Sequence, residues 1–154
     1  LNVTNIDILK AYQFARIMNH YQGFKLIQEA SKNYNWGLNL SELARIWTNG
    51  CIIKSDLMVE LVAIFKTTNN LLTNEKIIQE LKALKPSVKK VVSEGVLNEL
   101  PIPSLSESIN FLNNFSVVNS SANLIQAQRD YFGAHTYQRI DDASEKFYHT
   151  NWNN

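Results

Sequence analysis

The sequence predicts an all-α domain of about seven helices that ends in an irregular C-terminal tail. Apolar residues recur at steps of three and four along most of the chain, which is typical of one face of an α-helix. Side chains that commonly cap helices precede several of these segments. No alternating apolar and polar run is long enough to predict a strand with the same clarity, and the chain has neither an internal repeat nor a dividing linker.

Two helices are predicted in the first 50 residues. The first begins after Thr4, which can form a capping pair with Asp7, and ends at the Asn-Trp-Gly sequence of residues 35–37. The second begins after Asn39, with Glu42 three residues later. Their apolar faces are formed by Phe14, Ile17, Met18, Tyr21 and Phe24 in the first helix and by Leu40, Leu43, Ala44 and Trp47 in the second.

Three further helices are predicted between residues 51 and 100. One ends in the polar run 67–70, and the next begins after the capping residue Asn74. Pro86 is predicted to end that helix and to occupy the first position of the following one, because proline lacks the N–H that a helix interior needs. The three apolar faces are Ile53, Leu57, Leu61 and Ile64, then Ile77, Ile78, Leu81 and Leu84, and then Val88, Val91 and Val92.

The last two predicted helices follow the Pro-Ile-Pro connector at 101–103, where the residues preceding proline favour extended backbone. Ser104 and Glu107 predict a capping box for the sixth helix, and the seventh begins near residues 120–121. The apolar faces are Leu105, Ile109, Leu112 and Phe115 in the sixth helix and Leu124, Ala127 and Tyr131 in the seventh.

The tail, residues 141–154, loses helical periodicity but keeps three aromatic residues, Phe147, Tyr148 and Trp152. Large aromatic side chains are costly to leave in water. We therefore expect these rings to be at least partly covered, either because the tail folds back on its own domain or because it packs into another chain.

The composition is that of a globular protein of one domain. The 154 residues are 45% apolar and 19% charged, which is enough apolar surface to offset the entropy of ordering the chain. A net charge of +1 without a long charge block argues against sequence-independent nucleic-acid binding. No apolar run approaches the roughly 20 residues that span a bilayer. One cysteine and no signal pattern lead us to expect a cytoplasmic protein, and the first residue, Leu1, suggests a piece of a longer chain.

Few residues are arranged for metal binding or nucleophilic catalysis. The three histidines, His20, His135 and His149, are scattered along the chain, so we predict no metal site. Cys51 has no partner cysteine and no base near it in the sequence, which favours a small buried thiol over a nucleophile. The five glycines are isolated, so no glycine-rich phosphate loop is predicted.

Residues 124–137, LIQAQRDYFGAHTY, combine an arginine and a histidine with several aromatic rings. Arg129 is suited to bind a phosphate through two parallel charge-assisted hydrogen bonds, and His135 can add a donor. Six residues on an unbroken helix turn about 600°, which leaves these side chains about 120° apart. They can converge on one anion only if the helix ends near Gly133. From these residues alone, a solvated arginine and a packed histidine remain an open alternative.

Longer stretches closely resemble the decarboxylating 6-phosphogluconate dehydrogenase family. LIQAQRDYFGAHTYQR at 124–139 and FYHTNW at 147–152 are similar to its C-terminal signature. WTNGCIIKS at 47–55 is similar to a second motif, in which Lys54 stands where arginine is more common. AYQFARIMNHYQGFKLIQEAS at 11–31 and LPIPSLSESINF at 100–111 also match, so the resemblance covers nearly the whole chain.

The resemblance implies a place for this chain within a larger enzyme. Residues 1–140 correspond to the later part of the family's all-helical domain, and residues 141–154 to its tail. In the family this domain forms a homodimer, and the tail reaches the active site of the partner subunit. An arginine and a histidine there contact the substrate, 6-phosphogluconate, and the matching positions are Arg129 and His135.

The activity implied is oxidation of 6-phosphogluconate with NADP⁺ and loss of CO₂ to give ribulose 5-phosphate, in the pentose phosphate pathway. The family's dinucleotide fingerprint and its catalytic lysine, asparagine and glutamate are not found in this sequence. We therefore expect NADP to bind mainly to an N-terminal domain, assign no catalytic residue here, and expect the 154 residues alone to be inactive. Two alternatives are the helical domain of a related β-hydroxyacid dehydrogenase and a non-catalytic helical dimerisation module.

Overall fold

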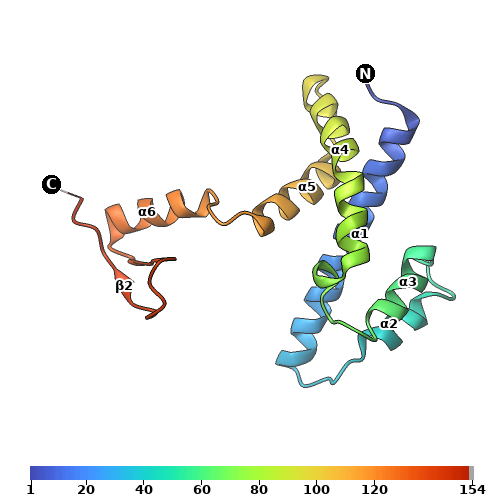
Figure 1. The fold of residues 1–154 in the computed structure, drawn as a ribbon, viewed down its shortest axis with the longest axis horizontal. Helices are drawn as coiled ribbons and strands as arrows, with labels where there is room; N and C mark the ends of the chain where they lie inside the picture. Colours follow the sequence, from blue (N-terminus) through green and yellow to red (C-terminus); the bar gives the residue numbers. More distant parts are fainter. Residues whose placement is uncertain (153–154) are drawn as a thin grey trace. The chain divides into compact units, whose positions relative to one another are not determined.

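The computed structural model describes residues 1–152, and the chain divides into two compact units, residues 1–112 and residues 113–154. The described residues form six α-helices, one 3₁₀-helix and two very short strands (Figure 1). The predicted all-α class is therefore confirmed. The predicted number of helices is one too high, and the difference arises at Pro86.

The first unit is built on two long helices, α1 (Asn5–Asn33) and α4 (Glu75–Leu97), which lie side by side and run in opposite directions (Figure 1). The capping box predicted at the start of α1 is present, since Asp7 and Thr4 bond each other's backbone N–H. Asp7 also accepts a hydrogen bond of 2.8 Å from Lys90 on α4. The Lys90 ammonium, together with the Thr4 donors, holds the pKa of Asp7 well below its usual range.

Two short helices, α2 (Leu40–Trp47) and α3 (Asp56–Ile64), pack together beside α1, and the 3₁₀-helix η1 (Leu71–Thr73) leads into α4. Asn39 and Asn74 cap α2 and α4 as predicted, each through its side-chain oxygen. The ring of Phe24 lies 5.4 Å from Trp47 and 4.5 Å from Phe65, which ties the C-terminal half of α1 to this pair. Most residues of the predicted apolar faces of these helices thus meet in one core, but Ile53, predicted on the third helix, lies in the loop before α3 and is exposed.

Pro86 lies inside α4, so the prediction that it ends a helix is wrong. The buried residues Leu81, Leu84 and Val88 follow at steps of three and four across the proline, and α1 covers them. The ring of Pro86 itself is on the exposed side of the helix. Burial of this continuous stripe outweighs the cost of one interior proline, which is about 3 kcal/mol relative to alanine.

Replacing Pro86 by alanine is expected to raise the free energy of unfolding by about 1–3 kcal/mol, because a helix bond is restored and no buried contact is lost. Thermal denaturation of the 154-residue chain, followed by circular dichroism, measures this. Lys89→Ala is a matched control, since Lys89 is also exposed on α4 and alanine and lysine have similar helix propensities. A Pro86→Ala chain no more stable than the original would mean that the proline shapes α4 for packing.

Helix α5 (Pro103–Ser116) begins one residue before the predicted capping residue. Pro103 occupies the first position, where its missing N–H costs nothing, and Ser104 lies inside the helix. The predicted capping box of Ser104 and Glu107 is therefore wrong. The ring of Phe111 lies 6.0 Å from that of Tyr21, so α5 packs against α1.

The second unit contains α6 (Ala122–Gly133) and two paired strands, β1 (Tyr137–Gln138) and β2 (Phe147–Tyr148). The strands are antiparallel, with Tyr137 opposite Tyr148. The sequence analysis predicted no strand here, because two residues are too few to show an alternating pattern. The predicted tail folds back on its own chain by means of this pairing.

The aromatic residues of the tail are covered to different extents. The Tyr148 ring is half-buried and stacks 6.2 Å from the Tyr137 ring. Trp152 packs edge-on to Tyr131 at 5.9 Å and is 40% exposed, whereas Phe147 is 66% exposed. The expected covering is thus partial, and the second unit keeps apolar surface in contact with solvent.

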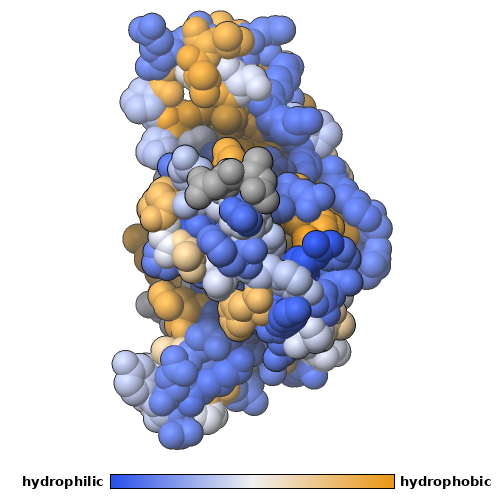
Figure 2. All heavy atoms as spheres, turned by 90° about the vertical axis from the view of Figure 1, so that its left-hand side faces the viewer, coloured by the Kyte–Doolittle hydropathy of each residue, from blue (hydrophilic) through white to orange (hydrophobic). Residues whose placement is uncertain are grey.

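Exposed apolar side chains are present in both units. Examples are Leu97 at 76% exposure in the first unit and Leu124 at 75% in the second. The face of the molecule drawn in Figure 2 shows several separate hydrophobic areas among hydrophilic residues. Among the described helices, none is both long and apolar enough to cross a membrane.

Candidate functional site

The carboxylate of Asp130 is hydrogen-bonded to several parts of the second unit. Asp130 lies in the last turn of α6 and is fully buried. Its Oδ1 accepts from the backbone N–H of Thr136 at 3.0 Å and lies 2.9 Å from Nδ1 of His149. Its Oδ2 accepts from the backbone N–H of Thr150 and from Nε1 of Trp152, both at 3.0 Å. One side chain therefore joins the end of α6 to the following turn and to the tail.

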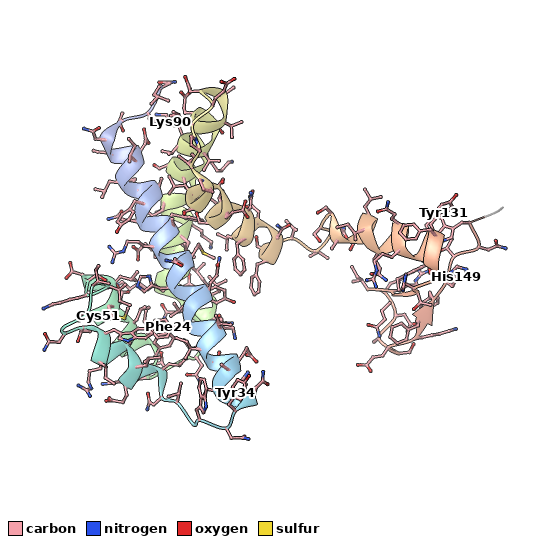
Figure 3. The ribbon with its side chains drawn as sticks, turned by 180° about the vertical axis from the view of Figure 1, so that it is seen from behind. Phe24, Tyr34, Cys51, Lys90, Tyr131 and His149 are labelled. Carbon is pink, nitrogen blue, oxygen red and sulfur yellow. The ribbon has the colours of Figure 1, made fainter. Side chains whose placement is uncertain are left out.

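The electrostatics of this cluster favour an ionised carboxylate. Burial by itself would raise the pKa of Asp130, but the donors from Thr150, His149, Trp152 and Thr136 outweigh it and lower the pKa to about 2. Because Asp130 is ionised and can only accept, the Nδ1 of His149 is the donor in their contact. Figure 3 shows His149 and Tyr131 near the C-terminal end of α6. The buried charge is thus matched by donors on both of its oxygens.

His135 lies on a turn with an unusual backbone. The residues on either side of it, Ala134 and Thr136, have φ angles of 47° and 60°, in the left-handed region that disfavours side chains other than glycine. Such positions cost of order 1–3 kcal/mol each and persist when surrounding contacts enforce them. A Cβ placed on Gly133 would lie 2.6 Å from the His135 ring, so glycine lets the ring lie against the end of α6.

Arg129 is exposed on α6 and is held by Gln126, one turn earlier on the helix. Its Nη1 donates to Oε1 of Gln126 at 3.1 Å. The amide nitrogen of the same glutamine donates to the carbonyl oxygen of Thr136 at 2.5 Å. The arginine guanidinium is therefore linked through one side chain to the turn that carries His135, which is itself exposed.

The sequence spacing allows Arg129 and His135 to converge only if the helix ends near Gly133, and it does end there. Helix α6 ends at Gly133, so His135 lies beyond the helix and its direction no longer follows helical spacing. Helical spacing therefore no longer fixes the angle of about 120° between the two side chains. Arg129, held by Gln126, and His135 are both exposed, and each is a side chain that can donate hydrogen bonds to a phosphate.

The second unit also contains a cavity of about 440 Å³, lined by Asn123, Gln126, Tyr137, Gln138 and Trp152 among others. Arg129 and His135 are not in its lining, which carries no charged side chain. Amides, hydroxyl groups and apolar rings line it instead. The cavity therefore includes Gln126, which contacts Arg129, but neither of the two predicted substrate-binding residues.

The roles of Asp130, Gln126 and His149 are not evident from the sequence pattern. One signal for Asp130 was available, because an acidic residue near the C-terminus of a helix opposes the helix dipole. Such a residue is favourable when donors outside the helix satisfy it, as they do here. The partners of Asp130 lie 6 to 22 residues away, and sequence spacing does not identify them.

The described residues form neither a metal site nor a sheet of the kind that binds a nucleotide. In residues 1–152, no three histidine, cysteine, aspartate or glutamate side chains are grouped so that they could hold a metal ion. Cys51, in the loop between α2 and α3, is a half-buried free thiol. The two-residue strands leave no sheet for a nucleotide fold in the part of the chain that the structure describes.

Comparison with known proteins identifies the family that the sequence motifs resemble, and the matches cover nearly the whole chain. The family model described as the C-terminal domain of 6-phosphogluconate dehydrogenase matches residues 3–152. The decarboxylating 6-phosphogluconate dehydrogenase of Treponema pallidum is 40% identical over 141 residues, covering 90% of this chain and 29% of the relative. That of Chlamydia pneumoniae is 39% identical over 149 residues, with 95% and 31% covered. The chain thus spans about a third of the length of these relatives.

A solved structure of the Plasmodium falciparum 6-phosphogluconate dehydrogenase superposes with a TM-score of 0.87 at 37% identity, covering 95% of this chain and 32% of that one. The P. falciparum enzyme has been described in its apo form and in complexes with its cofactor NADP⁺ and its substrate 6-phosphogluconate. Matches of this extent favour this family over the related β-hydroxyacid dehydrogenases. Sequence, fold and relatives agree, and the chain belongs to the 6-phosphogluconate dehydrogenase C-terminal domain family.

Proposed function

We propose that this chain is the C-terminal part of a cytoplasmic, NADP-dependent dehydrogenase that converts 6-phosphogluconate to ribulose 5-phosphate and CO₂. The observation that carries the proposal is the pair Arg129 and His135 at the end of α6, in a chain of this family. We assign both residues to substrate binding. Residues 1–140 then supply the later part of the helical domain, and residues 141–154 its tail.

The role proposed for Arg129 is to hold the terminal phosphate of the substrate. A guanidinium can donate two parallel hydrogen bonds to a phosphate, and this anchors the sugar far from the carbon that reacts. Binding energy from such a remote group serves to orient the reacting carbon. His135 adds a further donor to the same anion.

The remaining chemistry belongs to the rest of the longer protein. NADP⁺, when bound, accepts the hydride removed from the substrate. The described residues do not fit a dinucleotide site, because they form neither a parallel sheet nor a glycine-rich turn before a helix. No proton transfer is assigned to this chain either, and its contribution is to bind and orient the substrate.

A homodimer would cover apolar surface that the second unit leaves exposed. Helix α6 carries Leu124, Ile125, Tyr131 and Phe132, each more than half exposed. Such a concentration of apolar side chains is typical of an interaction surface. We propose that a second subunit covers it, and that Arg129 and His135 act in the active site of that second subunit.

The proposed activity is tested by assaying the full-length protein for NADPH production from 6-phosphogluconate, with release of CO₂ measured in parallel. We expect both products in equal amounts. A full-length protein that forms dimers but produces neither would support the alternative, a non-catalytic dimerisation module.

The proposed place of Arg129 across the dimer is tested by mixing two impaired variants and assaying them at a 6-phosphogluconate concentration well below the KM of the Arg129→Ala variant. One subunit carries Arg129→Ala, and the other lacks the family's catalytic lysine, which is outside this chain. In the heterodimer, one site would carry both lesions and the other neither, so part of the activity is expected to return. No recovery in a verified heterodimer would show that Arg129 serves its own subunit.

A further inference from the structure

The strained turn around His135 is held from both sides by α6. Thr136 has a left-handed φ of 60°, and both of its backbone polar groups are bonded to side chains of that helix. The N–H donates to Asp130 at 3.0 Å, and the carbonyl oxygen accepts from Gln126 at 2.5 Å. These two side chains are four residues apart and therefore lie on the same face of α6.

The side chain of Gln126 also bonds Arg129. Its amide oxygen accepts from the guanidinium at 3.1 Å while its amide nitrogen bonds the turn. An arginine can only donate, so the oxygen must face Arg129 and the nitrogen must face the carbonyl oxygen of Thr136. The two ends of one amide thus satisfy two different partners, and its orientation is determined.

We propose that Gln126 is a positioning residue that sets the direction of the Arg129 guanidinium relative to His135, with Asp130 holding the same turn from its N–H side. This inference rests on the proposed function, in which Arg129 and His135 bind one phosphate. Bidentate binding of phosphate requires the guanidinium fork to be aligned. The glutamine supplies that alignment before the substrate arrives, without touching it.

The test compares Gln126→Ala with the matched control Gln128→Ala in the full-length dehydrogenase. Gln128 is an exposed glutamine on the same helix, two residues further on. For Gln126→Ala we expect the KM for 6-phosphogluconate to rise about three- to tenfold, because a misaligned guanidinium keeps its charge but loses part of its hydrogen bonding to the phosphate. The kcat and the KM for NADP⁺ should change little. Gln128→Ala should leave all three constants unchanged.

The alanine and glutamate variants of Gln126 should rank differently in their KM for 6-phosphogluconate if the residue only fills space. Gln126→Glu keeps the size of the side chain, but it places a carboxylate against Arg129 and opposite the Thr136 carbonyl oxygen. If Gln126 positions the arginine for an anion, the glutamate variant should raise the KM for 6-phosphogluconate more than alanine does. If the glutamine only fills space, glutamate should be the milder change, and that order would overturn the proposal.

A double-mutant cycle separates this proposal from the one on which it rests. In an Arg129→Ala background, Gln126→Ala should have almost no further effect on the KM for 6-phosphogluconate, because the residue through which it acts is gone. Additive effects would overturn the positioning role while leaving the role of Arg129 intact. No effect of Arg129→Ala on that KM would overturn the proposed function, and the positioning role with it.

Discussion

Replacing Arg129 by alanine in the full-length dehydrogenase is expected to raise the KM for 6-phosphogluconate by about one to two orders of magnitude. A charged hydrogen bond is worth roughly 1.5–3 kcal/mol, and removing the guanidinium leaves a phosphate dianion without its partner. The KM for NADP⁺ should change little, because no contact with the cofactor is assigned to this residue. Initial-rate kinetics with each substrate varied in turn measure both constants.

Two further variants define the role of Arg129. Arg129→Lys should recover only part of the binding, since an ammonium keeps the charge but loses the planar fork. His135→Ala should cost less than Arg129→Ala, because a histidine adds a single donor. Arg139→Ala is the matched control, since Arg139 lies in the same unit but pairs with the exposed Asp141. A control variant as impaired as Arg129→Ala would contradict a specific phosphate contact.

Replacing Asp130 by alanine is expected to release the tail and the turn from α6. The change leaves the backbone N–H groups of Thr136 and Thr150 and the ring nitrogens of His149 and Trp152 without their common acceptor. We expect hydrogen exchange at Thr136 and Thr150 to become faster by about two orders of magnitude, because donors without an acceptor no longer resist opening. Exchange of the 154-residue chain, followed by mass spectrometry, measures this.

The first unit provides the control for Asp130. Amides in α1 and α4 should exchange at the same rate in Asp130→Ala as in the original chain, since the donors to Asp130 named above all belong to the second unit. Asp141→Asn, which removes an exposed carboxylate of the second unit, should leave Thr136 and Thr150 protected. Unchanged protection in Asp130→Ala would mean that strand pairing and ring stacking are enough to hold the tail.

The same carboxylate makes the second unit sensitive to acid. The pKa of Asp130 in the folded chain is about 2, below the ordinary value of 3.8, so folding favours its ionised form. The stabilisation is fully present above about pH 4 and is lost as the pH falls from 3.8 towards 2. The NMR signal of the Trp152 indole N–H, which donates to Asp130, should therefore show a transition between pH 5 and 1.5. Asp130→Asn should remove the contribution of this group, while Asp142, whose pKa is also about 2, still titrates.

The sequence correctly predicted most of the local features. Thr4, Asn39 and Asn74 cap their helices as predicted, because a capping side chain bonds a backbone N–H only three residues away. The apolar stripe of α1 is buried as predicted, since its period follows from helix geometry. The end of α6 at Gly133, which the placement of His135 requires, could likewise be expected from a glycine at that point.

Predictions from single residues were wrong where distant packing or an adjacent residue decided the outcome. Pro86 normally ends a helix, but the buried stripe against α1 continues through it. Serine is a common capping residue, but Ser104 lies inside α5 because Pro103 already occupies the first helical position. In both cases a local preference of a few kcal/mol or less was outweighed by the geometry of the surrounding chain.

For the candidate site, the sequence by itself determined the residue types, Arg129 and His135, and through long matching motifs the family. The tertiary structure alone decided how they are held. The turn at 134–136 has a strained backbone that no sequence pattern indicates, and it is fixed by Gln126 and Asp130. Asp130 in turn depends on donors that arrive from the tail up to 22 residues later. Hydrogen bonds between such distant positions form only once the chain has folded, and spacing along the chain does not reveal them.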